Sequence, residues 1–468
     1  MKRFPTTIVF LAAITLSAGR TESVAPREQA ALDHITADAL RGDLSFLASD
    51  ALEGRATPSR GLDLAAEFIA SHFRRAGLEP IGPEGSYFQW AKFVEVTPNL
   101  SDLKLTLTAD REDLELTASD VRVHAIGALD ITKQPVTILS GTTANIEGRI
   151  VAGEARRYGS EAAINRLQAH HPALILLVAE HGEPQEPTYL EDVEAGFAPV
   201  LTVINADAVS AVSEKRSLSL SVHLSAPVTK EASLRNVAGI LRGSDPALRN
   251  QYVIVSAHYD HLGRDADQLV FNGANDNGSG TVSVLELASA LATLPVHPAR
   301  SILFLTVFGE EEGLLGAYFY ARHPLVPVKD TVADINLEMM GRTDDPAGAK
   351  VGAISMTGMA FSDLPSTMTA AARAEGVSVY TRPNEAEFFS RSDNYAFALA
   401  GIVAHTVLVA FDYPDYHAVG DKWQKIDYAN MAKVDKAVGA GILDIANAPA
   451  RPKWSNAKEA ALYRDGGK

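Results

Sequence analysis

Three apolar segments in the C-terminal half of this 468-residue chain lead directly to charged side chains. The junctions are residues 252–257 with His258, residues 301–308 with the glutamates at 310–312, and residues 334–337 with Glu338. Such apolar runs predict buried strands. In open α/β sheets, ligands bind outside the carboxyl ends of the strands. We therefore expect these side chains to converge at one sheet edge and to form a metal site there.

Each of these residues, taken alone, also has a purely structural interpretation. His258 can be a structural histidine at a strand end, although Asp260, two residues on, could orient its ring as a metal ligand. The glutamates at 310–312 can be a solvated helix start. They follow an apolar strand, however, and like charges crowded at a sheet edge are unfavourable without a cation.

Two further segments supply candidate ligands. The run Asn-Asp-Asn-Gly-Ser-Gly at 275–280 can be a turn and a helix cap, or it can present the Asp276 carboxylate to two metals. His417 lies in a Pro-Asp-Tyr-His segment that would otherwise be a surface loop. Imidazoles and carboxylates without a thiolate suit zinc, and also cobalt or manganese. Aminopeptidases and phosphatases use pairs of such metals ~3.5–4 Å apart.

The elements that must position these residues follow from hydrophobic periodicity. Residues 34–78 predict a pair of helices. Alternation of apolar and polar residues at 103–107 and 218–224 predicts strands in the middle of the chain. From residue 236 onward, apolar runs alternate with helical stretches, which is typical of a layered α/β domain. We interpret the middle block as an insertion into a domain that both flanks form.

The overall charge narrows the class of partner. The chain carries 58 acidic and 42 basic residues, for a net charge of −16. This balance argues against nucleic acid or an anionic membrane surface as a partner, because the phosphates would be repelled. The chain has no cysteine, which excludes disulfides and lipid attachment to a cysteine.

The first residues indicate export. Lys2 and Arg3 precede an apolar stretch at 8–16 and small residues at 17–19, so we expect residues 1–25 to be a signal peptide. Export without disulfides is compatible with a bacterial periplasm or with secretion. No other apolar run approaches the ~20 residues of a membrane span. We therefore expect a periplasmic or secreted protein without a membrane span.

The candidate residues lie in a set of six sequence motifs that resembles a known protein family. In chain order they are AHYDHLG, NGANDNGSG, FGEEEGLLGA, INLEMMGR, RSDNYAFALAGI and PDYHAVGDKWQKIDY. As an ordered set they resemble the two-zinc metallopeptidase family of bacterial secreted aminopeptidases, aminopeptidase Y, glutamate carboxypeptidase II and glutaminyl cyclase. The segments at 146–151 and 199–203 resemble a degenerate protease-associated domain.

The resemblance implies a fold and a division into domains. The fold would be a three-layer α/β/α sandwich with a mixed central sheet and a smaller β-rich, α+β inserted domain. Residues 26–100 and 231–450 would form the zinc peptidase domain, residues 101–230 the protease-associated-like insertion, and residues 451–468 a C-terminal tail.

The resemblance also implies roles for the candidate residues, with two Zn²⁺ per chain as cofactor. The implied roles are: His258 and Glu338 on one zinc; Glu311 and His417 on the other; Asp276 bridging both; Glu310 as general base; Asp260 orienting His258; and Tyr416 polarising the substrate carbonyl. Glu338 stands where many members have aspartate, and its side chain reaches one methylene further.

The expected activity is hydrolysis of peptide substrates from the amino end. Within the same family, a carboxypeptidase would need arginines for a terminal carboxylate, for which Arg342, Arg382 and Arg391 are candidates. A glutaminyl cyclase would keep one zinc, and a binding module without catalysis would have lost ligands. A phosphatase fits the metals but not the ordered motifs. The oligomeric state does not follow from the sequence.

The signal segment leads to the first testable prediction. Protein purified from its native host should begin about 18–25 residues after Met1, because a signal peptidase removes such segments during export. Amino-terminal sequencing of the mature protein and fractionation of the cells measure this. An intact Met1 on the mature chain would contradict the prediction.

Overall fold

A computed structural model describes most of the chain after the expected signal segment. The described residues are 26–140, 145–159, 161–182, 185, 187–191, 197–464 and 466. The expected signal peptide, residues 1–25, lies outside them.

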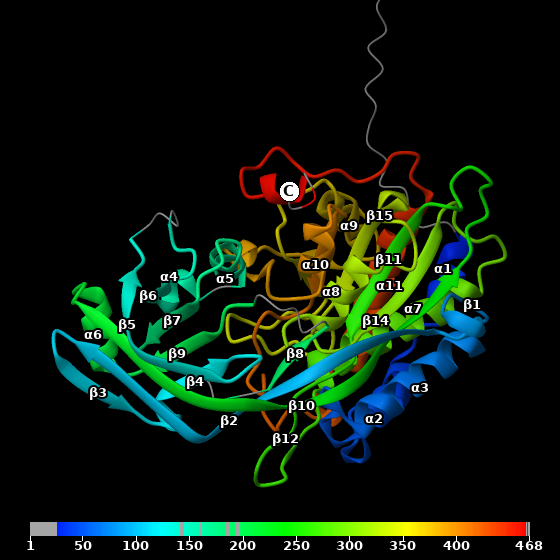
Figure 1. The fold of residues 1–468 in the computed structure, drawn as a ribbon. Coiled ribbons are helices and arrows are strands. Elements are labelled where there is room, and N and C mark those ends of the chain that lie inside the picture. Colours follow the sequence, from blue (N-terminus) through cyan, green and yellow to red (C-terminus); the bar gives the residue numbers. More distant parts are fainter. Residues whose placement is uncertain are drawn as a thin grey trace, which may run out of the picture.

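A mixed sheet forms the centre of the larger lobe (Figure 1). Four of its strands run parallel, in the order β18 (Ala404–Leu408), β15 (Thr331–Leu337), β11 (Tyr252–His258) and β14 (Ser301–Val307). The long strand β10 (Leu218–Leu241) pairs antiparallel with β14. The carboxyl ends of β15, β11 and β14 therefore lie side by side, as expected for the strands that precede the charged residues.

Alternate side chains of these strands enter two different cores. Val253 and Val255 of β11 belong to the core beneath one layer of helices, whereas Ile254 belongs to the core on the opposite face. Such alternation is a property of any strand, because successive side chains point to opposite faces. Because apolar side chains lie on both faces of these strands, helices can cover the sheet on both sides. The larger lobe is thus the three-layer α/β/α sandwich expected from the sequence.

Two sets of helices cover the faces. The first set, which packs with the first core, comprises α2 (Ala37–Leu47), α3 (Arg60–Arg75), α7 (Gly280–Ala292), α9 (Leu364–Ala374) and α11 (Tyr428–Asn447). The second set comprises α8 (Leu315–Arg322) and α10 (Asn394–Leu399). Helices α2 and α3 are the pair expected at residues 34–78. Their starts are capped by the side chains of Thr36 and Ser59, which accept otherwise unpaired backbone N–H groups.

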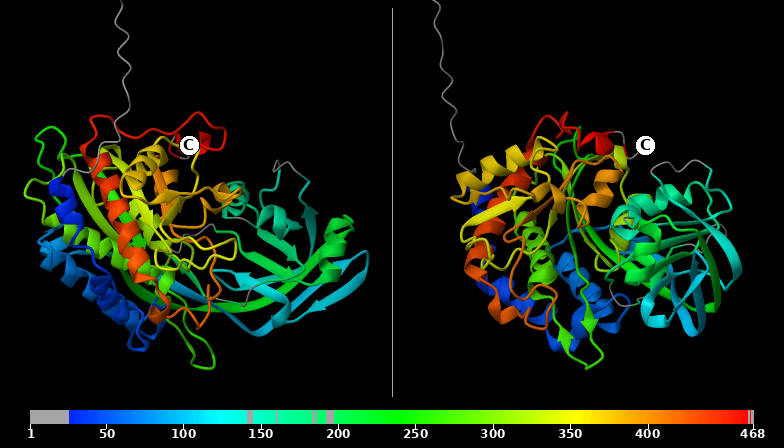
Figure 2. Two further views of the ribbon diagram at one scale, coloured as in Figure 1. Left: turned by 180° about the vertical axis from the view of Figure 1, so that it is seen from behind. Right: turned by 90° about the vertical axis from the view of Figure 1, so that its left-hand side faces the viewer.

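Two long strands connect the larger lobe to a smaller one. Strand β2 (Phe88–Ala109, 22 residues) and β10 (24 residues) pair along their lengths and curve from one lobe into the other (Figure 2). The smaller lobe continues the same sheet through β5 (Leu129–Ile138), β6 (Ile150–Glu154) and β7 (Leu174–Ala179). It has its own hydrophobic cores.

The boundaries expected at residues 100 and 230 fall inside β2 and β10, so one sheet, with 16 strands among the described residues, runs through both lobes. The interpretation of residues 101–230 as a protease-associated-like domain stays a prediction.

A second connection ties the lobes together. Strand β8 (Thr188–Leu190) adds to the edge of β2. The Glu191 carboxylate that follows it pairs with Arg322 at 2.6 Å and also contacts His323, both at the end of α8. The smaller lobe is thereby held against the helix that follows the 310–312 loop.

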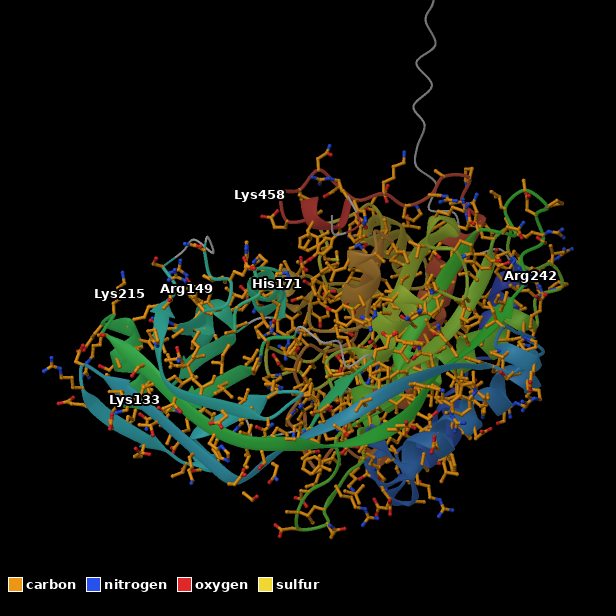
Figure 3. The ribbon with its side chains drawn as sticks, viewed as in Figure 1. Lys133, Arg149, His171, Lys215, Arg242 and Lys458 are labelled. Atoms are coloured by element: carbon orange, nitrogen blue, oxygen red, sulfur yellow. The ribbon has the colours of Figure 1, made fainter. Side chains whose placement is uncertain are left out.

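Several basic side chains lie far apart on the surface. Lys133, Arg149 and Lys215 project from the outer part of the smaller lobe, far from Arg242 at the other end of the molecule (Figure 3). Arg242 forms an ion pair with Glu79 at 2.6 Å. Among the described residues, no helix combines the length and apolar character needed to cross a bilayer.

A buried acidic pair lies among the helices, away from the sheet edge. Burial raises the pKa of Glu286, on α7, to about 7, and the neighbouring Asp43 charge adds to the shift. Burial also raises the pKa of Asp43 to about 6. The Asp43 Oδ2 atom lies 3.5 Å from His72 Nδ1, and burial with the nearby Arg75 charge lowers the pKa of His72 to about 4. Burial thus favours the uncharged form of each of these three groups.

The acidic pair predicts how stability depends on pH. The folded chain holds the Glu286 proton up to about pH 7, whereas the unfolded chain releases it near the usual pKa of 4.5. Stability is therefore greatest below the usual pKa and falls as pH rises through the folded pKa. Replacing Glu286 by Gln should remove up to roughly 3 kcal/mol of this fall, at ~1.4 kcal/mol per pKa unit. Denaturant unfolding at about pH 5 and pH 8 measures it, with Glu459→Gln as an exposed control.

Candidate metal centre

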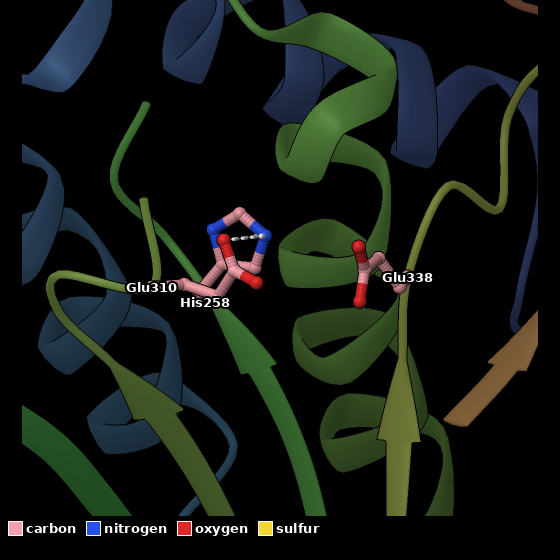
Figure 4. A group of neighbouring side chains, drawn as sticks. All are labelled: His258, Glu310 and Glu338. Carbon is pink, nitrogen blue, oxygen red and sulfur yellow. Dashed lines mark ion pairs between the residues drawn. The ribbon is translucent and has the colours of Figure 1, made fainter. Parts of the chain in front are cut away.

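The charged residues that follow three neighbouring strands do converge. His258 ends β11, Glu310 lies in the turn after β14, and Glu338 follows β15 directly. Figure 4 shows their three side chains facing one another across the carboxyl edge of the sheet. Ligand atoms of the three residues lie within 4.8 Å of one another.

The imidazole of His258 is surrounded by carboxylates. Its Nε2 lies 3.4 Å from Asp276 Oδ1 and 3.8 Å from Glu310 Oε2, and its Nδ1 lies 3.5 Å from Asp260 Oδ1. The ring is fully buried, and neither nitrogen has a hydrogen-bond partner among the described residues. Burial lowers the pKa of His258, but the charges of Glu310, Asp260 and Asp276 raise it well above its ordinary value.

A second group lies on the other side of Asp276. His417 Nε2 is 3.1 Å from Asp276 Oδ2 and 3.2 Å from Glu311 Oε2. His261 Nδ1 is 2.7 Å from the other Glu311 oxygen, Oε1. The two oxygens of Asp276 thus face one imidazole each, His258 and His417. This is the placement expected of a carboxylate shared by two metal positions.

Burial raises the pKa of Glu310 and Glu338, the two glutamates that lie beside His258. Burial raises the pKa of Glu310 well above its ordinary value; the positive charge of His258 opposes the shift, and Glu311, Glu338 and Asp393 add to it. Burial raises the pKa of Glu338 to about 7, although His258 and a hydrogen bond from Ser392 lower it. Without a cation nearby, carboxylates that are crowded and buried favour the protonated, neutral form.

Hydrogen bonds to the backbone hold the loops that carry these residues. Asp260 accepts the N–H groups of Glu310 at 3.1 Å and of Glu311 at 3.4 Å. Asp421 accepts the N–H groups of Asn275 at 3.0 Å and of Asp276 at 3.1 Å. Both aspartates therefore act on loop conformation. For Asp260, this contact adds to the orientation of His258 that the sequence predicts.

A buried arginine from the N-terminal part of the chain joins the same loops. The Arg55 guanidinium is 1% exposed and donates to the carbonyl oxygens of Tyr259 at 2.8 Å and of Gly273 at 2.9 Å. It also donates to the carbonyl oxygens of Leu47 and Asn272. Arg55 thus places a fixed positive charge close to the carboxylates and binds the loops before and after the hairpin at 263–271.

The structure brings together the eight residues that the sequence suggested as ligands or catalytic groups of a metal site. His258, Asp260, Asp276, Glu310, Glu311, Glu338, His417 and Tyr416 all lie around this sheet edge, although their individual roles stay predictions. The Tyr416 ring stacks on His417 with a centroid distance of 4.0 Å and lines a pocket next to Glu338.

Sequence reasoning missed His261, Ser392, Arg55 and Asp421. His261 lies three residues after His258 in the same motif, which was the one signal that could have identified it. Ser392 lies within the RSDNYAFALAGI motif; its hydroxyl accepts a hydrogen bond from Asn336 at 2.7 Å, and it lines the same pocket as Glu338. Arg55 and Asp421 act through backbone contacts that no local pattern encodes.

The side chains present fit divalent zinc. Three imidazoles, those of His258, His261 and His417, and several carboxylates are assembled without a thiolate, which is a zinc-compatible donor set. His258 Nε2 and Glu338 Oε2 are buried polar atoms without a hydrogen-bond partner among the described residues. Buried groups of this kind are usually satisfied by a partner or an ion. A bound cation would satisfy both.

Comparisons with known proteins agree with this chemistry. Residues 236–442 match Peptidase family M28. A probable leucine aminopeptidase of Arthroderma benhamiae is 25% identical over 362 residues, which cover 73% of this chain and 92% of that protein.

The fold is also similar to solved structures. An aminopeptidase from Aneurinibacillus sp. strain AM-1 aligns over 91% of this chain and 97% of its own, with a TM-score of 0.62 and 19% identity. A zinc aminopeptidase from Bacillus subtilis aligns over 92% and 98%, with a TM-score of 0.51 and 20% identity. These two likenesses establish the fold.

The positions of the two adjacent glutamates predict different effects of the same substitution. Glu310→Gln should keep both metals and reduce kcat by at least ~10²-fold, as expected for loss of a general base. Glu311→Gln should weaken one of two metals, because Glu311 lies between His261 and His417. Elemental analysis and steady-state kinetics measure both effects, and Glu312→Gln serves as the matched control. Equal metal loss in the Glu310 and Glu311 variants would show that the roles are misassigned.

Proposed function

Because residues 236–442 of this chain form a domain of Peptidase family M28, we propose that the protein is a two-zinc aminopeptidase that releases N-terminal residues from peptides. The observation that carries the proposal is the position of Asp276 between His258 and His417, with Glu310 beside the first of them. The expected signal segment supports action in the periplasm or outside the cell.

The proposed ligands divide between two positions. One would be held by His258 and Glu338, the other by Glu311 and His417, with Asp276 shared. When bound, zinc lowers the pKa of water and polarises the scissile carbonyl. The Asp260 carboxylate, 3.5 Å from His258 Nδ1, keeps the other ring nitrogen directed at the site.

Glu310 is the proposed general base. Its carboxylate takes a proton from the attacking water and passes it to the leaving amine. Burial and the neighbouring carboxylates raise the pKa of Glu310, so this carboxylate accepts a proton readily. The Tyr416 hydroxyl would donate a hydrogen bond to the carbonyl oxygen on which negative charge develops. Tyr416 is 38% exposed, so substrate can reach it.

A small pocket beside Glu338 is the proposed entry for the first side chain of a peptide. Its cavity volume is about 40 Å³, it opens to solvent, and both Glu338 and Tyr416 line it. Met339, Phe388 and Leu408 provide apolar walls. A peptide whose α-ammonium lies near Glu310 and Glu338 would direct its first side chain into this pocket. The apolar walls favour substrates with aliphatic or aromatic first residues.

The arginines proposed for a carboxypeptidase are mostly paired. Arg342 donates to Asp344 at 2.6 Å and to Asp415 at 2.9 Å, and its side chain is 5% exposed. Arg382 pairs with Asp412 at 2.6 Å. Two of the three candidates are therefore already neutralised by carboxylates. This pairing weakens the carboxypeptidase alternative relative to an aminopeptidase.

The deciding prediction concerns which end of the substrate must be free. Leucyl- and alanyl-anilides should be cleaved, whereas their acetylated forms should be essentially inert. Acetylation removes a charged hydrogen bond, worth ~1.5–3 kcal/mol, and adds bulk beside the buried glutamates. Comparison of kcat/KM for free and acetylated anilides measures the effect. Equal rates on both, or shortening of peptides from the carboxyl end, would exclude the aminopeptidase and leave the metallopeptidase.

A further inference from the structure

His261, which is not among the proposed ligands or catalytic groups, contacts the carboxylate of the proposed ligand Glu311. Its ring is fully buried, and its Nδ1 lies 2.7 Å from Glu311 Oε1. We propose that His261 is a positioning residue that donates a hydrogen bond from Nδ1 to Glu311 and leaves only the other carboxylate oxygen for a metal. The proposal rests on the proposed two-metal function.

The two oxygens of Glu311 face different partners. Oε1 is at hydrogen-bond distance from His261, and Oε2 lies 3.2 Å from His417 Nε2, one of the proposed ligands. A nitrogen and a carboxylate oxygen at 2.7 Å require one proton between them, and the carboxylate is the acceptor. The proton therefore resides on Nδ1, and Glu311 is held as a single-oxygen ligand on the side of His417 and Asp276.

The surroundings of His261 fix its ring. A Cβ at Gly273 would lie 2.4 Å from its Cγ, so the ring packs directly on the glycine backbone. Its backbone N–H donates to the Arg55 carbonyl oxygen at 3.3 Å, and the Arg55 guanidinium donates to Gly273. Arg55 thus ties down both the backbone that carries the imidazole and the glycine against which it packs. An imidazole held in this way can orient a ligand before any metal binds.

Among the described residues, the other proposed metal position has no matching contact. The Glu338 Oε2 atom lacks a hydrogen-bond partner there, and Ser392, which lines the same pocket, offers only a neutral hydroxyl. The position at Glu311 is therefore preorganised, and the position at Glu338 is the looser of the two. Loss of His261 should weaken one position selectively.

Two substitutions separate donation from ring packing. His261→Asn keeps an N–H donor close to the Nδ1 position, and His261→Phe keeps the ring volume without a donor. In the full chain, His261→Phe should weaken one of two zinc affinities by ~10–100-fold and leave the other almost unchanged. His261→Asn should stay close to the unsubstituted protein. His297→Phe is the matched control, because His297 Nδ1 contacts the Arg242 carbonyl oxygen at 2.9 Å away from the site.

Zinc titration against a competing chelator measures the two affinities, and kinetics should show a lower kcat with KM unchanged. Retention of both affinities in His261→Phe would overturn the proposal. X-ray absorption of the zinc-loaded unsubstituted protein gives an independent reading that needs no variant. Two imidazoles per two zinc ions support positioning, and three would make His261 a ligand instead. The metal count and the peptidase activity of the unsubstituted protein test the proposed function separately.

Discussion

Repulsion among buried carboxylates is the constraint on which this molecule depends. Asp276, Glu310, Glu311 and Glu338 meet at one sheet edge, where burial weakens the screening of like charges. Among the described residues, the acids do not each have a basic partner. One buried arginine supplies fixed positive charge nearby, and backbone N–H groups donate to the supporting aspartates. Arg55 is fully buried close to the acids, and the backbone N–H groups of the carrying loops are bonded to Asp260 and Asp421. The remaining deficit of positive charge is what makes the edge a site for cations.

This constraint explains why distant segments must meet. Arg55 comes from the segment between α2 and α3, yet it bonds to the backbone of the loops around residues 259 and 273. The N-terminal segment therefore does more than cover one face of the sheet. Its Arg55 side chain also brings positive charge to the acids and joins the two loops by hydrogen bonds. The smaller lobe is joined to the same sheet through β2 and β10 and contacts the end of α8 through Glu191. Changes in the smaller lobe can thus reach the helix that follows the glutamate loop.

The two proposed metal positions would share Asp276, but their surroundings are built differently. Around Glu311, a packed imidazole and the Arg55 clamp leave little freedom. Around Glu338, the carboxylate lies beside Ser392 and the open pocket. Under the proposed function, the more rigid position would keep one metal fixed while the looser one accommodates the substrate amine and carbonyl.

Local pattern predicted the layered α/β class and the metal-ligand candidates, whereas the three-layer arrangement and the suggested role of Tyr416 came from the family resemblance. Apolar strands that end in His258, Glu310 and Glu338 predicted a parallel edge with converging ligands, because strand polarity and hydrophobic runs are written in consecutive residues. The spacing of apolar residues likewise predicted the α2–α3 pair. The extent of β2 and β10, which cross both expected domain boundaries, could not be read in this way.

The roles of His261, Ser392, Arg55 and Asp421 emerged only in three dimensions. Their partners lie far along the chain, for example 204 residues from Arg55 to Tyr259 and 146 from Asn275 to Asp421. Candidate metal ligands can be recognised in a sequence by their residue type. A supporting contact depends on the distance and direction between two groups, which are set only when the layers pack.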